Sequence, residues 1–489
     1  MTSETLGSAE WRRARRDPQA SAGRSGWSRA FNCVGHRVPG FPDRGHYDRV
    51  VLLSLDAGAA ERTDIPGSGA HAGTDQCPGA VVAHQAEDGG VVRIRVPGGT
   101  CSREVLAALA DWSIELGNGR LELTARGNLQ LRGLAPGAEE ELATRLAAYG
   151  LLPSVAHDRA RNVLASPLSG RDRMSVLDVR PLVAELDRRL CASPELAELS
   201  GRFLFALDDG RGDVAGMRAD VAVMAMPGHW VALLLAGLDT GLRLPVHAAV
   251  SGMLMAASAF LRRRADHRVW RLAELPDGPL SLVGELAAEL AEVTHAPELA
   301  VPEPDPRGPI GRIEETDGRV ALAACVPLGE LTPSRCRLLA AVAQREVVLT
   351  PWRGVVLPGL TRSAAGRAAR RLAGAGLILD SGSPALGVSA CTGRPGCAKA
   401  QADVRADASV ALSVSTPEPL GLPEPLGLAR QLPVHWSGCA RRCGRPRGPA
   451  VDVVAMDEGY QVLRDDRLEY FGTEVAVVRI VAAHARRRW

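Results

Sequence analysis

Apolar and polar positions first form a regular pattern near residue 91. Residues 91–96 alternate in the way that a half-buried strand does. Ser102 is a suitable N-cap for a following helix whose apolar side chains share one face. These side chains are Val105, Leu109, Trp112 and Leu116. A second strand is predicted over 120–124, and a second helix over 138–149 that ends at Gly150.

The same pattern recurs in the second half of the chain. Residues 121–152 align without a gap on 347–378, an offset of 226 (347 − 121), and 12 of the 32 aligned positions are identical. A strand is predicted before this stretch, at 320–325, and a helix that begins at Thr332 with Pro333 in its first turn. This duplication predicts an α+β fold of two similar halves related by a pseudo-twofold axis. Ligands often bind at interfaces of this kind.

The chain is predicted to have five segments. Residues 1–75 are rich in Gly, Ser, Arg and Asp and are expected to be largely disordered or loosely attached. The repeated units occupy 76–152 and 306–380. A longer segment follows each unit, over 153–305 and 381–489.

Four cysteines in the last segment carry the clearest chemical signal. They form a C-x5-C pair and a C-x3-C pair, and they are Cys391, Cys397, Cys439 and Cys443. Four thiolates in one place make a soft, anionic cage that suits an iron–sulfur cluster. Zinc, which usually takes tighter cysteine pairs, and unrelated buried thiols remain as alternatives.

Charge and composition exclude several classes of protein. The formal net charge is only +2, and aromatic residues make up 4%, which argues against a dedicated nucleic-acid binder. No apolar run reaches the length of a membrane span. The ten cysteines are not spaced like a secreted disulfide scaffold, so a reducing cytoplasm is expected.

A polar segment follows the first predicted strand. If residues 124–132 were one extended strand, five polar side chains would share a face. They are Thr124, Arg126, Asn128, Gln130 and Arg132. Arginine forks bind carboxylates through two hydrogen bonds. With Arg161, Arg202 and Arg353 they predict a site for a polyanionic ligand, although a solvated polar edge is the alternative for the strand alone.

These motifs together resemble the sirohaem-dependent nitrite and sulfite reductase superfamily over residues 75–489. The matching elements are the T-x-R-x-N-x-Q-L-R-G stretch from Thr124, the Arg161-Asn-Val triplet and the four cysteines. The resemblance implies two ferredoxin-like modules and two α+β modules, the last of which binds the cluster. It also implies that the four cysteines hold a [4Fe–4S] cluster and that the arginines bind the carboxylates of a tetrapyrrole.

One departure separates this chain from the reductases of that superfamily. Those enzymes carry a K-F-K motif whose lysines deliver protons, whereas this chain has Arg202, Phe203 and Leu204. Arginine is too basic to donate protons near neutral pH, and leucine has none to give. The site is therefore poorly equipped for the six-electron reduction of nitrite or sulfite.

Other phrases resemble the precorrin-3B synthase branch. They begin at Cys77 (CPG), Arg161 (RNVLASP), Phe205 (FALDDG), Leu349 (LTPWRG) and His435 (HWSGC). The resemblance implies a monooxygenase of aerobic cobalamin biosynthesis. It would hydroxylate precorrin-3A with O2 and close a γ-lactone to give precorrin-3B, using a [4Fe–4S] cluster and a mononuclear non-haem iron.

The resemblance also assigns roles to residues. The polar side chains from Thr124 to Arg132, with Arg161, Arg202 and Arg353, would bind the acid arms of the tetrapyrrole substrate. An external ferredoxin or NADH-dependent reductase would supply electrons. The iron ligands and catalytic residues stay unassigned, because no 2-His-1-carboxylate spacing is visible. A sirohaem-dependent nitrite or sulfite reductase and a non-catalytic cluster or zinc protein are the alternative functions.

Overall fold

The computed structural model describes residue 75 and residues 77–264, 266–413, 432–446 and 448–486. The predicted N-terminal segment, 1–75, lies outside the described residues except for Asp75. None of the described helices has the length and apolar character needed to cross a membrane.

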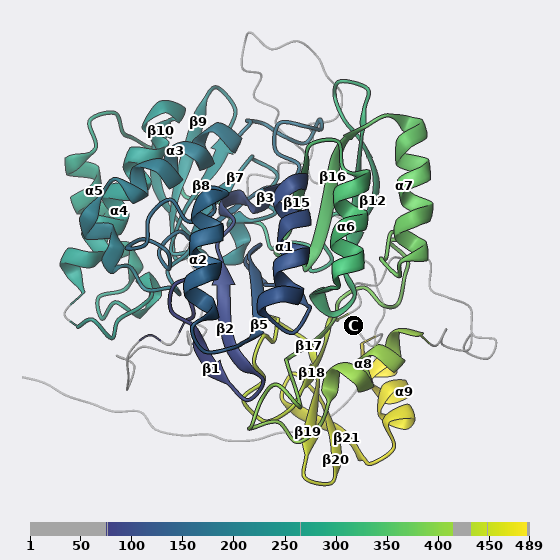
Figure 1. Ribbon diagram of the computed structural model, residues 1–489. Helices are drawn as coiled ribbons and strands as arrows, with labels where there is room; N and C mark the ends of the chain where they lie inside the picture. The colour runs from purple at the N-terminus through teal and green to yellow at the C-terminus, as the bar shows by residue number, and fades with distance from the viewer. Residues whose placement is uncertain (1–74, 76, 265, 414–431, 447, 487–489) are drawn as a thin grey trace, which may run out of the picture. The chain divides into compact units, whose positions relative to one another are not determined.

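The first half of the duplication forms a five-stranded antiparallel sheet (Figure 1). Its strands, in spatial order, are β1 (His84–Ala86), β2 (Gly89–Ile94), β5 (Leu129–Leu134), β4 (Leu121–Leu123) and β14 (Glu330–Leu331). Helices α1 (Arg103–Leu116) and α2 (Ala138–Ala148) belong to this half. Ser102 caps α1 as predicted, because its hydroxyl accepts the Val105 N–H at 3.2 Å.

The second half forms a matching antiparallel sheet. Its strands are β12 (Gly311–Glu314), β13 (Val320–Cys325), β16 (Gly354–Leu360), β15 (Glu346–Leu349) and β3 (Thr100–Ser102). Helices α6 (Pro333–Val342) and α7 (Arg362–Gly374) are capped by the hydroxyls of Thr332 and Thr361. In Figure 1, α1 and α6 lie next to each other, with α2 to the left of α1 and α7 to the right of α6.

The two halves exchange one short strand each. Strand β3 of the first half pairs with β15, and β14 of the second half pairs with β4. Cys101 lies opposite Val347, and Leu331 lies opposite Leu121. Side chains of both halves fill one continuous apolar core, in which α1 packs against α6. The predicted duplication is confirmed, and its halves are built as one unit.

A larger module follows each half, and the two modules share a topology. The first sheet contains β6 (Val163–Ala165), β7 (Phe205–Asp208), β8 (Val221–Met226), β9 (Trp230–Leu235), β10 (Leu238–Pro245) and β11 (Thr294–His295). The second contains β17 (Val388–Ala390), β18 (Val434–Ser437), β19 (Val451–Met456), β20 (Gly459–Arg464) and β21 (Arg467–Gly472). In both sheets the first three strands are parallel and the later ones antiparallel.

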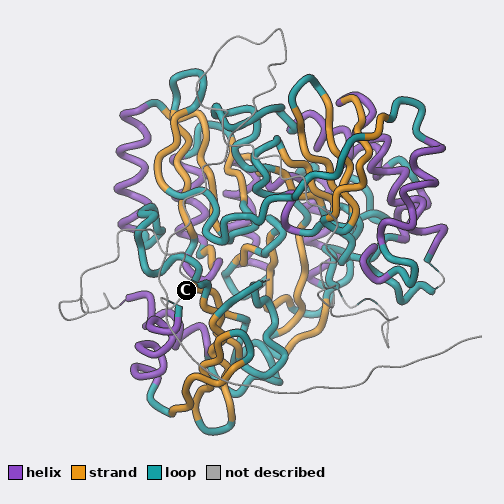
Figure 2. Tube along the Cα trace, turned by 180° about the vertical axis from the view of Figure 1, so that it is seen from behind, coloured by secondary structure: helices purple, strands orange, loops and turns teal. Residues whose placement is uncertain are grey.

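Helices occupy similar places in the two modules. In the first, α3 (Arg180–Cys191) lies between the first two strands along the chain, and α4 (Ala249–Arg263) and α5 (Val283–Glu289) follow β10. In the second, α8 (Val404–Ser413) lies between β17 and β18, and α9 (Val475–Ala485) follows β21. Figure 2 shows the strands and helices of this arrangement from behind. Short 3-10 turns include η1 (Pro97–Gly99), η2 (Pro194–Glu198), η3 (Ala215–Met217), η4 (Val246–Ala248), η5 (Leu272–Glu274), η6 (Pro279–Leu282) and η7 (Pro327–Gly329).

The prediction that residues 124–132 form one extended strand is wrong. Strand β4 ends at Leu123 and β5 begins at Leu129, so residues 124–128 reverse the chain. The Gly127 N–H donates to the Thr124 carbonyl, and Gly127 has a φ of +62° that few other residues adopt readily. Only Gln130 and Arg132 of the polar segment lie on the strand.

Candidate functional site

Two predicted site residues, Thr124 and Asn128, shape the turn between β4 and β5. The Thr124 hydroxyl accepts the backbone N–H groups of Arg126 and Asn128 at 3.3 and 3.1 Å. The buried Asn128 side chain accepts the Val96 N–H and donates to the Asn162 carbonyl oxygen Oδ1, both at 2.9 Å. Both side chains therefore form hydrogen bonds within the protein. The bond from the Arg126 N–H to the Thr124 hydroxyl also fixes the backbone of that arginine.

Three arginines gather beside this turn, and we call Arg93, Arg95 and Arg126 the arginine group. Arg95 is 1% exposed, and it donates to Asn162 Oδ1 at 3.2 Å and to the Gly201 carbonyl at 3.3 Å. Arg126 donates to the same carbonyl at 3.2 Å. Among the described residues the Nε atoms of Arg93 and Arg95 have no hydrogen-bond partner.

The charges of this group repel one another. Burial, and then Arg93 and Arg126, lower the pKa of Arg95 to about 9. Burial, and then Arg271 and Arg93, lower the pKa of Arg126 to about 10. Cations that are packed together and buried in this way are stabilised by an anion, and such perturbed groups are typical of functional sites. The arginine group is therefore suited to hold ligand carboxylates.

Sequence reasoning did not identify Arg93 and Arg95. A signal was present, because the alternating pattern over 91–96 places both side chains on one face of the strand. The apolar positions of this pattern fill the core as expected, and the two arginines occupy the positions between them.

Two other predicted arginines, Arg202 and Arg353, lie in different places. Arg202 is exposed beside Gly201, with its guanidinium carbon 4.7 Å from the centre of the Trp270 ring. The Arg353 guanidinium donates to the Gly444 carbonyl at 3.2 Å, and burial followed by Arg405 lowers its pKa. Arg202 thus adjoins the arginine group, whereas Arg353 adjoins the last two cysteines.

Arg132 and Arg161 are taken up by carboxylates of the protein. Arg132 is bound by Asp88 at 2.7 and 3.0 Å, and it also donates to the Gly396 carbonyl at 2.8 Å, next to Cys397. Arg161, 2% exposed, is bound by Asp187 at 2.7 and 2.8 Å. These partners give both side chains structural bonds, and the substrate-binding role expected of them gains no support from their contacts.

The fold brings the two cysteine pairs together. Cys391 follows β17 and Cys439 follows β18, which is the neighbouring parallel strand. The Gly438 N–H donates to Cys391 Sγ at 3.1 Å. Burial raises the pKa of the Cys391 thiol, and the neighbouring Cys443 and Cys397 raise it further, while the Gly438 N–H opposes this. All four are free thiols, and this donor set fits an iron–sulfur cluster.

His435 supports the loop of the last cysteine. The side chain is fully buried, and its Nε2 lies 3.1 Å from the Cys443 carbonyl while Nδ1 lies 2.9 Å from the Ser389 hydroxyl. Burial, and then Arg353, lower the pKa of His435 to about 3, so the ring is neutral at pH 7. One ring nitrogen thus contacts the backbone of the Cys443 loop, and the other contacts the hydroxyl of Ser389.

Hydrogen bonds connect the arginine group to the cysteines, and we call this series the polar chain. Arg93 donates to Gln130 at 3.1 Å, and Gln130 donates to Glu122 at 3.0 Å. Arg405 of α8 donates to Glu122 at 2.5 Å and to the Cys391 carbonyl at 3.1 Å. The sequence pattern did not indicate Arg405, because its partner Glu122 is 283 residues away.

The second sheet has no counterpart of the polar chain. Glu122, Gln130 and Arg93 are cross-strand neighbours in the first sheet, and the duplication aligns them with Val348, Val356 and Ala323. These three apolar residues form a small buried cluster with Leu168. The aligned positions of the second face are therefore apolar, although charged residues line a cavity beside them.

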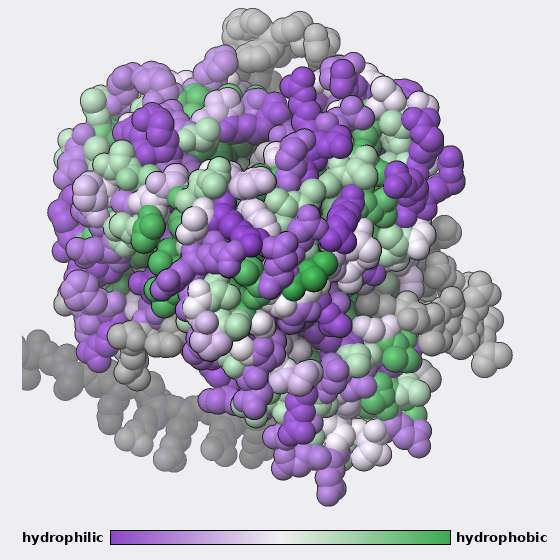
Figure 3. All heavy atoms as spheres, viewed as in Figure 1, coloured by the Kyte–Doolittle hydropathy of each residue, from purple (hydrophilic) through white to green (hydrophobic). Residues whose placement is uncertain are grey.

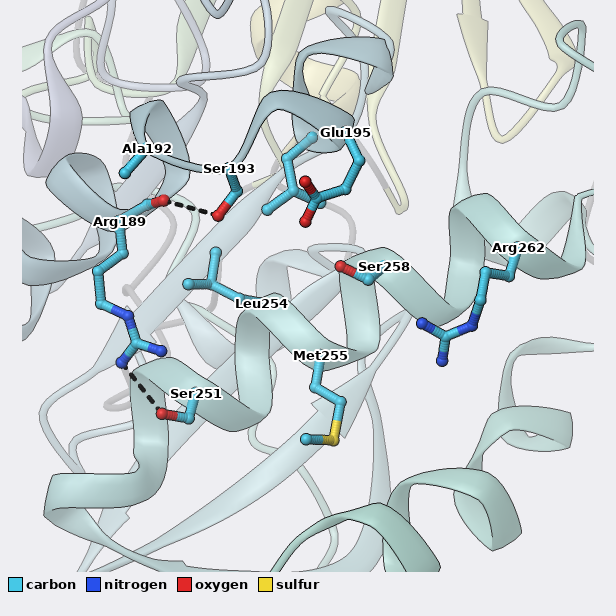
Figure 4. Close-up of a pocket in the computed structure, with 10 residues that line it drawn as sticks. Arg189, Ala192, Ser193, Glu195, Ser251, Leu254, Met255, Ser258 and Arg262 are labelled. Carbon is cyan, nitrogen blue, oxygen red and sulfur yellow. Dashed lines mark hydrogen bonds between the residues drawn. The ribbon is translucent and has the colours of Figure 1, made fainter.

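Two cavities lie away from these residues. One of about 430 Å³ lies beside α3, η2 and α4, where Arg189 donates to Ser251 at 3.0 Å (Figure 4). The other, of about 770 Å³, is lined by residues that include Arg171, Glu315 and Glu346. Neither is lined by the arginine group or the four cysteines. The face in Figure 3 is mostly hydrophilic, with hydrophobic side chains in small groups.

Three carboxylates lie close together in the first module. Asp208, Asp209 and Asp213 have oxygens within 4.8 Å of one another. Four backbone N–H groups bind Asp208, and Arg211 binds Asp209 and lies 3.8 Å from Asp213. Burial, and then Asp208, raise the pKa of Asp213 to about 7. Because Asp208 and Asp209 already have partners within the protein, the iron ligands stay unassigned.

A family model matches both halves of the duplicated core. The model for the nitrite/sulfite reductase ferredoxin-like half domain matches residues 84–149 and 312–375. Each half of the core is therefore similar to such a half domain. The matched residues include the two strands, β3 and β14, that the halves exchange.

Similar proteins include a precorrin-3B synthase and two reductases. A precorrin-3B synthase of Sinorhizobium sp is 26% identical over 390 residues, which cover 78% of this chain and 81% of the relative. A ferredoxin–nitrite reductase of Synechococcus elongatus is 27% identical over 415 residues, which cover 77% and 78%. A sulfite reductase of Mycolicibacterium paratuberculosis is 31% identical over a shorter stretch, 28% of this chain and 24% of the relative.

A solved structure is similar to the two half domains and their modules together. The NirA protein of Mycobacterium tuberculosis has a TM-score of 0.61 and 21% identity, over 78% of this chain and 76% of that one. At this identity the likeness concerns the fold. The resemblance to precorrin-3B synthase and to the nitrite/sulfite reductase superfamily, predicted from motifs, is confirmed, as is the duplicated α+β fold.

Proposed function

We propose that this chain is an oxidoreductase of the precorrin-3B synthase type. It hydroxylates precorrin-3A with O2 and forms a γ-lactone, which gives precorrin-3B in aerobic cobalamin biosynthesis. The observation that carries this proposal is the polar chain, which runs from the arginine group across one face of the first sheet to the backbone of Cys391, the first of the four cysteines.

The arginines bind and orient the substrate. A macrocycle with acetate and propionate arms presents several carboxylates, and Arg95, Arg126 and Arg202 surround the Gly201 backbone where they can meet them. Guanidinium–carboxylate pairs are strong because they are charge-assisted and geometrically matched. Fixing the macrocycle in one orientation contributes several kcal/mol to the rate, up to about 7–11 in well-oriented systems.

The four thiolates hold the cluster. Cys391, Cys397, Cys439 and Cys443 would bind a [4Fe–4S] cluster, which supplies single electrons when present. A non-haem iron is expected from the resemblance alone. An external ferredoxin or NADH-dependent reductase delivers the electrons, and the domain limits proposed from the sequence place the cluster in residues 381–489.

The residue at the second lysine position argues against a reductase. Leu204 is 3% exposed, its side chain packs in an apolar cluster, and its N–H donates to Asp220 at 2.8 Å. No proton donor stands at this position. The likeness to a nitrite reductase over most of the chain nevertheless makes a sirohaem-dependent reductase the second candidate.

The chromophore of the purified protein tests both proposals. Protein isolated without oxygen is expected to contain iron and labile sulfide and to lack a tetrapyrrole. Given precorrin-3A, a reductant and isotope-labelled O2, it should yield a lactone that carries the label, as measured by mass spectrometry. Bound sirohaem, with absorption in the red, together with nitrite reduction would establish the second candidate instead.

A further inference from the structure

The Ser437 hydroxyl is a buried polar group without a partner. The side chain is fully buried, and among the described residues its Oγ makes no hydrogen bond. An unmade hydrogen bond in a buried place is costly, so such a group in a native protein calls for an explanation.

The register of the sheet places Ser437 beside Cys391. Ser389 pairs with His435 and Ala390 pairs with Trp436 in parallel strands. The Cys391 N–H then donates to the Trp436 carbonyl at 2.9 Å, which continues the ladder by one step. Cys391 is therefore the cross-strand neighbour of Ser437.

Ser437 also points to the side of the sheet that supports the other cysteines. Side chains alternate along β18, so Ser437 shares a face with His435, whose ring reaches the Cys443 carbonyl. The next residue, Gly438, already donates its N–H to Cys391 Sγ. The free hydroxyl thus lies on the side of the sheet that faces the Cys391 side chain and the loop of Cys443.

The first module shows what a longer side chain does at this position. Strands β7 and β18 align through their pairing with β8 and β19, so Asp208 corresponds to Ser437. The Asp208 carboxylate accepts four backbone N–H groups of the loop that follows it. Serine is too short to organise its loop in this way, which leaves its hydroxyl for another acceptor.

We propose that Ser437 donates a hydrogen bond to a sulfur atom of the cluster held by Cys391 and its partners, and thereby raises the reduction potential of that cluster. The inference rests on the proposed cluster but not on the identity of the substrate. Reduction adds negative charge to the cluster, and a donor aimed at its sulfurs stabilises the reduced form.

An isosteric pair of variants separates the hydroxyl from the size of the side chain. Ser437→Thr keeps a hydroxyl. Ser437→Val has the shape of threonine but carries a methyl group in place of that hydroxyl. Redox titrations followed by electron paramagnetic resonance should give a more negative midpoint for Ser437→Val than for Ser437→Thr. Ser437→Ala should likewise titrate below the wild type. Ser113→Ala, which removes a buried hydroxyl in α1 bonded to the Ala110 carbonyl, should leave the midpoint unchanged.

Each outcome decides the question. Equal midpoints for the valine and threonine variants at full cluster content would overturn the inference while leaving the proposed function intact. Cluster loss from the valine and alanine variants but not from the threonine variant supports a bond from the hydroxyl. Loss from all three shows that only the size of Ser437 matters and overturns the inference. A wild-type protein without iron and sulfide would instead refute the proposed function.

Discussion

Replacing Arg95 by methionine should leave the stability of the ligand-free protein nearly unchanged but weaken tetrapyrrole binding. Burial and two neighbouring arginines lower the pKa of Arg95 from 12.5 to about 9. Because one pKa unit corresponds to about 1.4 kcal/mol, the buried charge costs at most about 5 kcal/mol at pH 7. Methionine is similar in length and removes this charge.

The hydrogen bonds lost with Arg95 offset that gain. Both of its acceptors keep another donor, since Asn128 still donates to Asn162 Oδ1 and Arg126 still donates to the Gly201 carbonyl. Two bonds from a charged donor are worth about 1.5–3 kcal/mol each, which is close to the cost of the buried charge. The free energy of unfolding should therefore change by no more than about 2 kcal/mol, measured by urea denaturation of the cluster-loaded protein.

Ligand binding, by contrast, should weaken. A charge-assisted hydrogen bond contributes about 1.5–3 kcal/mol, so the affinity for uroporphyrin III, a macrocycle with acetate and propionate arms, should fall about 10- to 150-fold. Arg161→Met is the matched control, because Arg161 is equally buried but paired with Asp187. Breaking that buried pair should destabilise the protein by about 3–5 kcal/mol. If both variants lose stability to the same extent and Arg95→Met binds the macrocycle normally, the arginine group is structural and the reasoning is refuted.

Three further changes test other parts of the structure. Cys439→Ser should abolish cluster assembly, whereas Cys336→Ser, at a buried thiol of α6, should keep full iron and sulfide content. Glu122→Gln should cost about 3 kcal/mol in urea denaturation, because it leaves the arginine of α8 without its half-buried carboxylate. Gly99→Ala should cost more than about 3 kcal/mol in the same assay, since the new Cβ would lie 2.1 Å from a carbonyl oxygen of β15, whereas Gly119→Ala, with similar φ and open space, should cost about 1 kcal/mol. Wild-type stability in Glu122→Gln, or equal losses at the two glycines, would contradict the contacts described.

The duplication could be predicted because patterns between neighbouring residues of the sequence indicate it. Apolar periodicity and caps such as Ser102 and Thr332 depend on neighbours along the chain, and both helices begin where expected. The strand exchange could not be predicted in this way. Strands β3 and β14 are three and two residues long, and their pairing is decided by the packing of the two halves.

The site was only partly predictable for the same reason. The cysteines form two short sequence motifs, and the parallel pairing of β17 with β18 brings those motifs together. The roles of the arginines depend on distant partners, such as Asp187 for Arg161 and Asp88 for Arg132. The turn at Gly127 also divided the polar segment that a strand pattern had joined.

The two modules share a fold but join their first two loops differently, one by ion pairs and the other by cysteines. In the first module Arg211 binds Asp172 from the loop after β6 and Asp209 from the loop after β7. The shared topology places Cys391 and Cys397 in the loop of the second module that matches the first of these, and Cys439 and Cys443 in the loop that matches the second. A guanidinium paired with carboxylates is saturated by its partners, whereas four thiols leave their bonding capacity for a metal cluster. The polar face of the first half of the duplication adjoins both modules, because Arg95 and Arg126 donate to Gly201 of the first module and Arg405 of the second module donates to Glu122. The first module thus contributes a backbone carbonyl group to this face, and the second contributes the thiols.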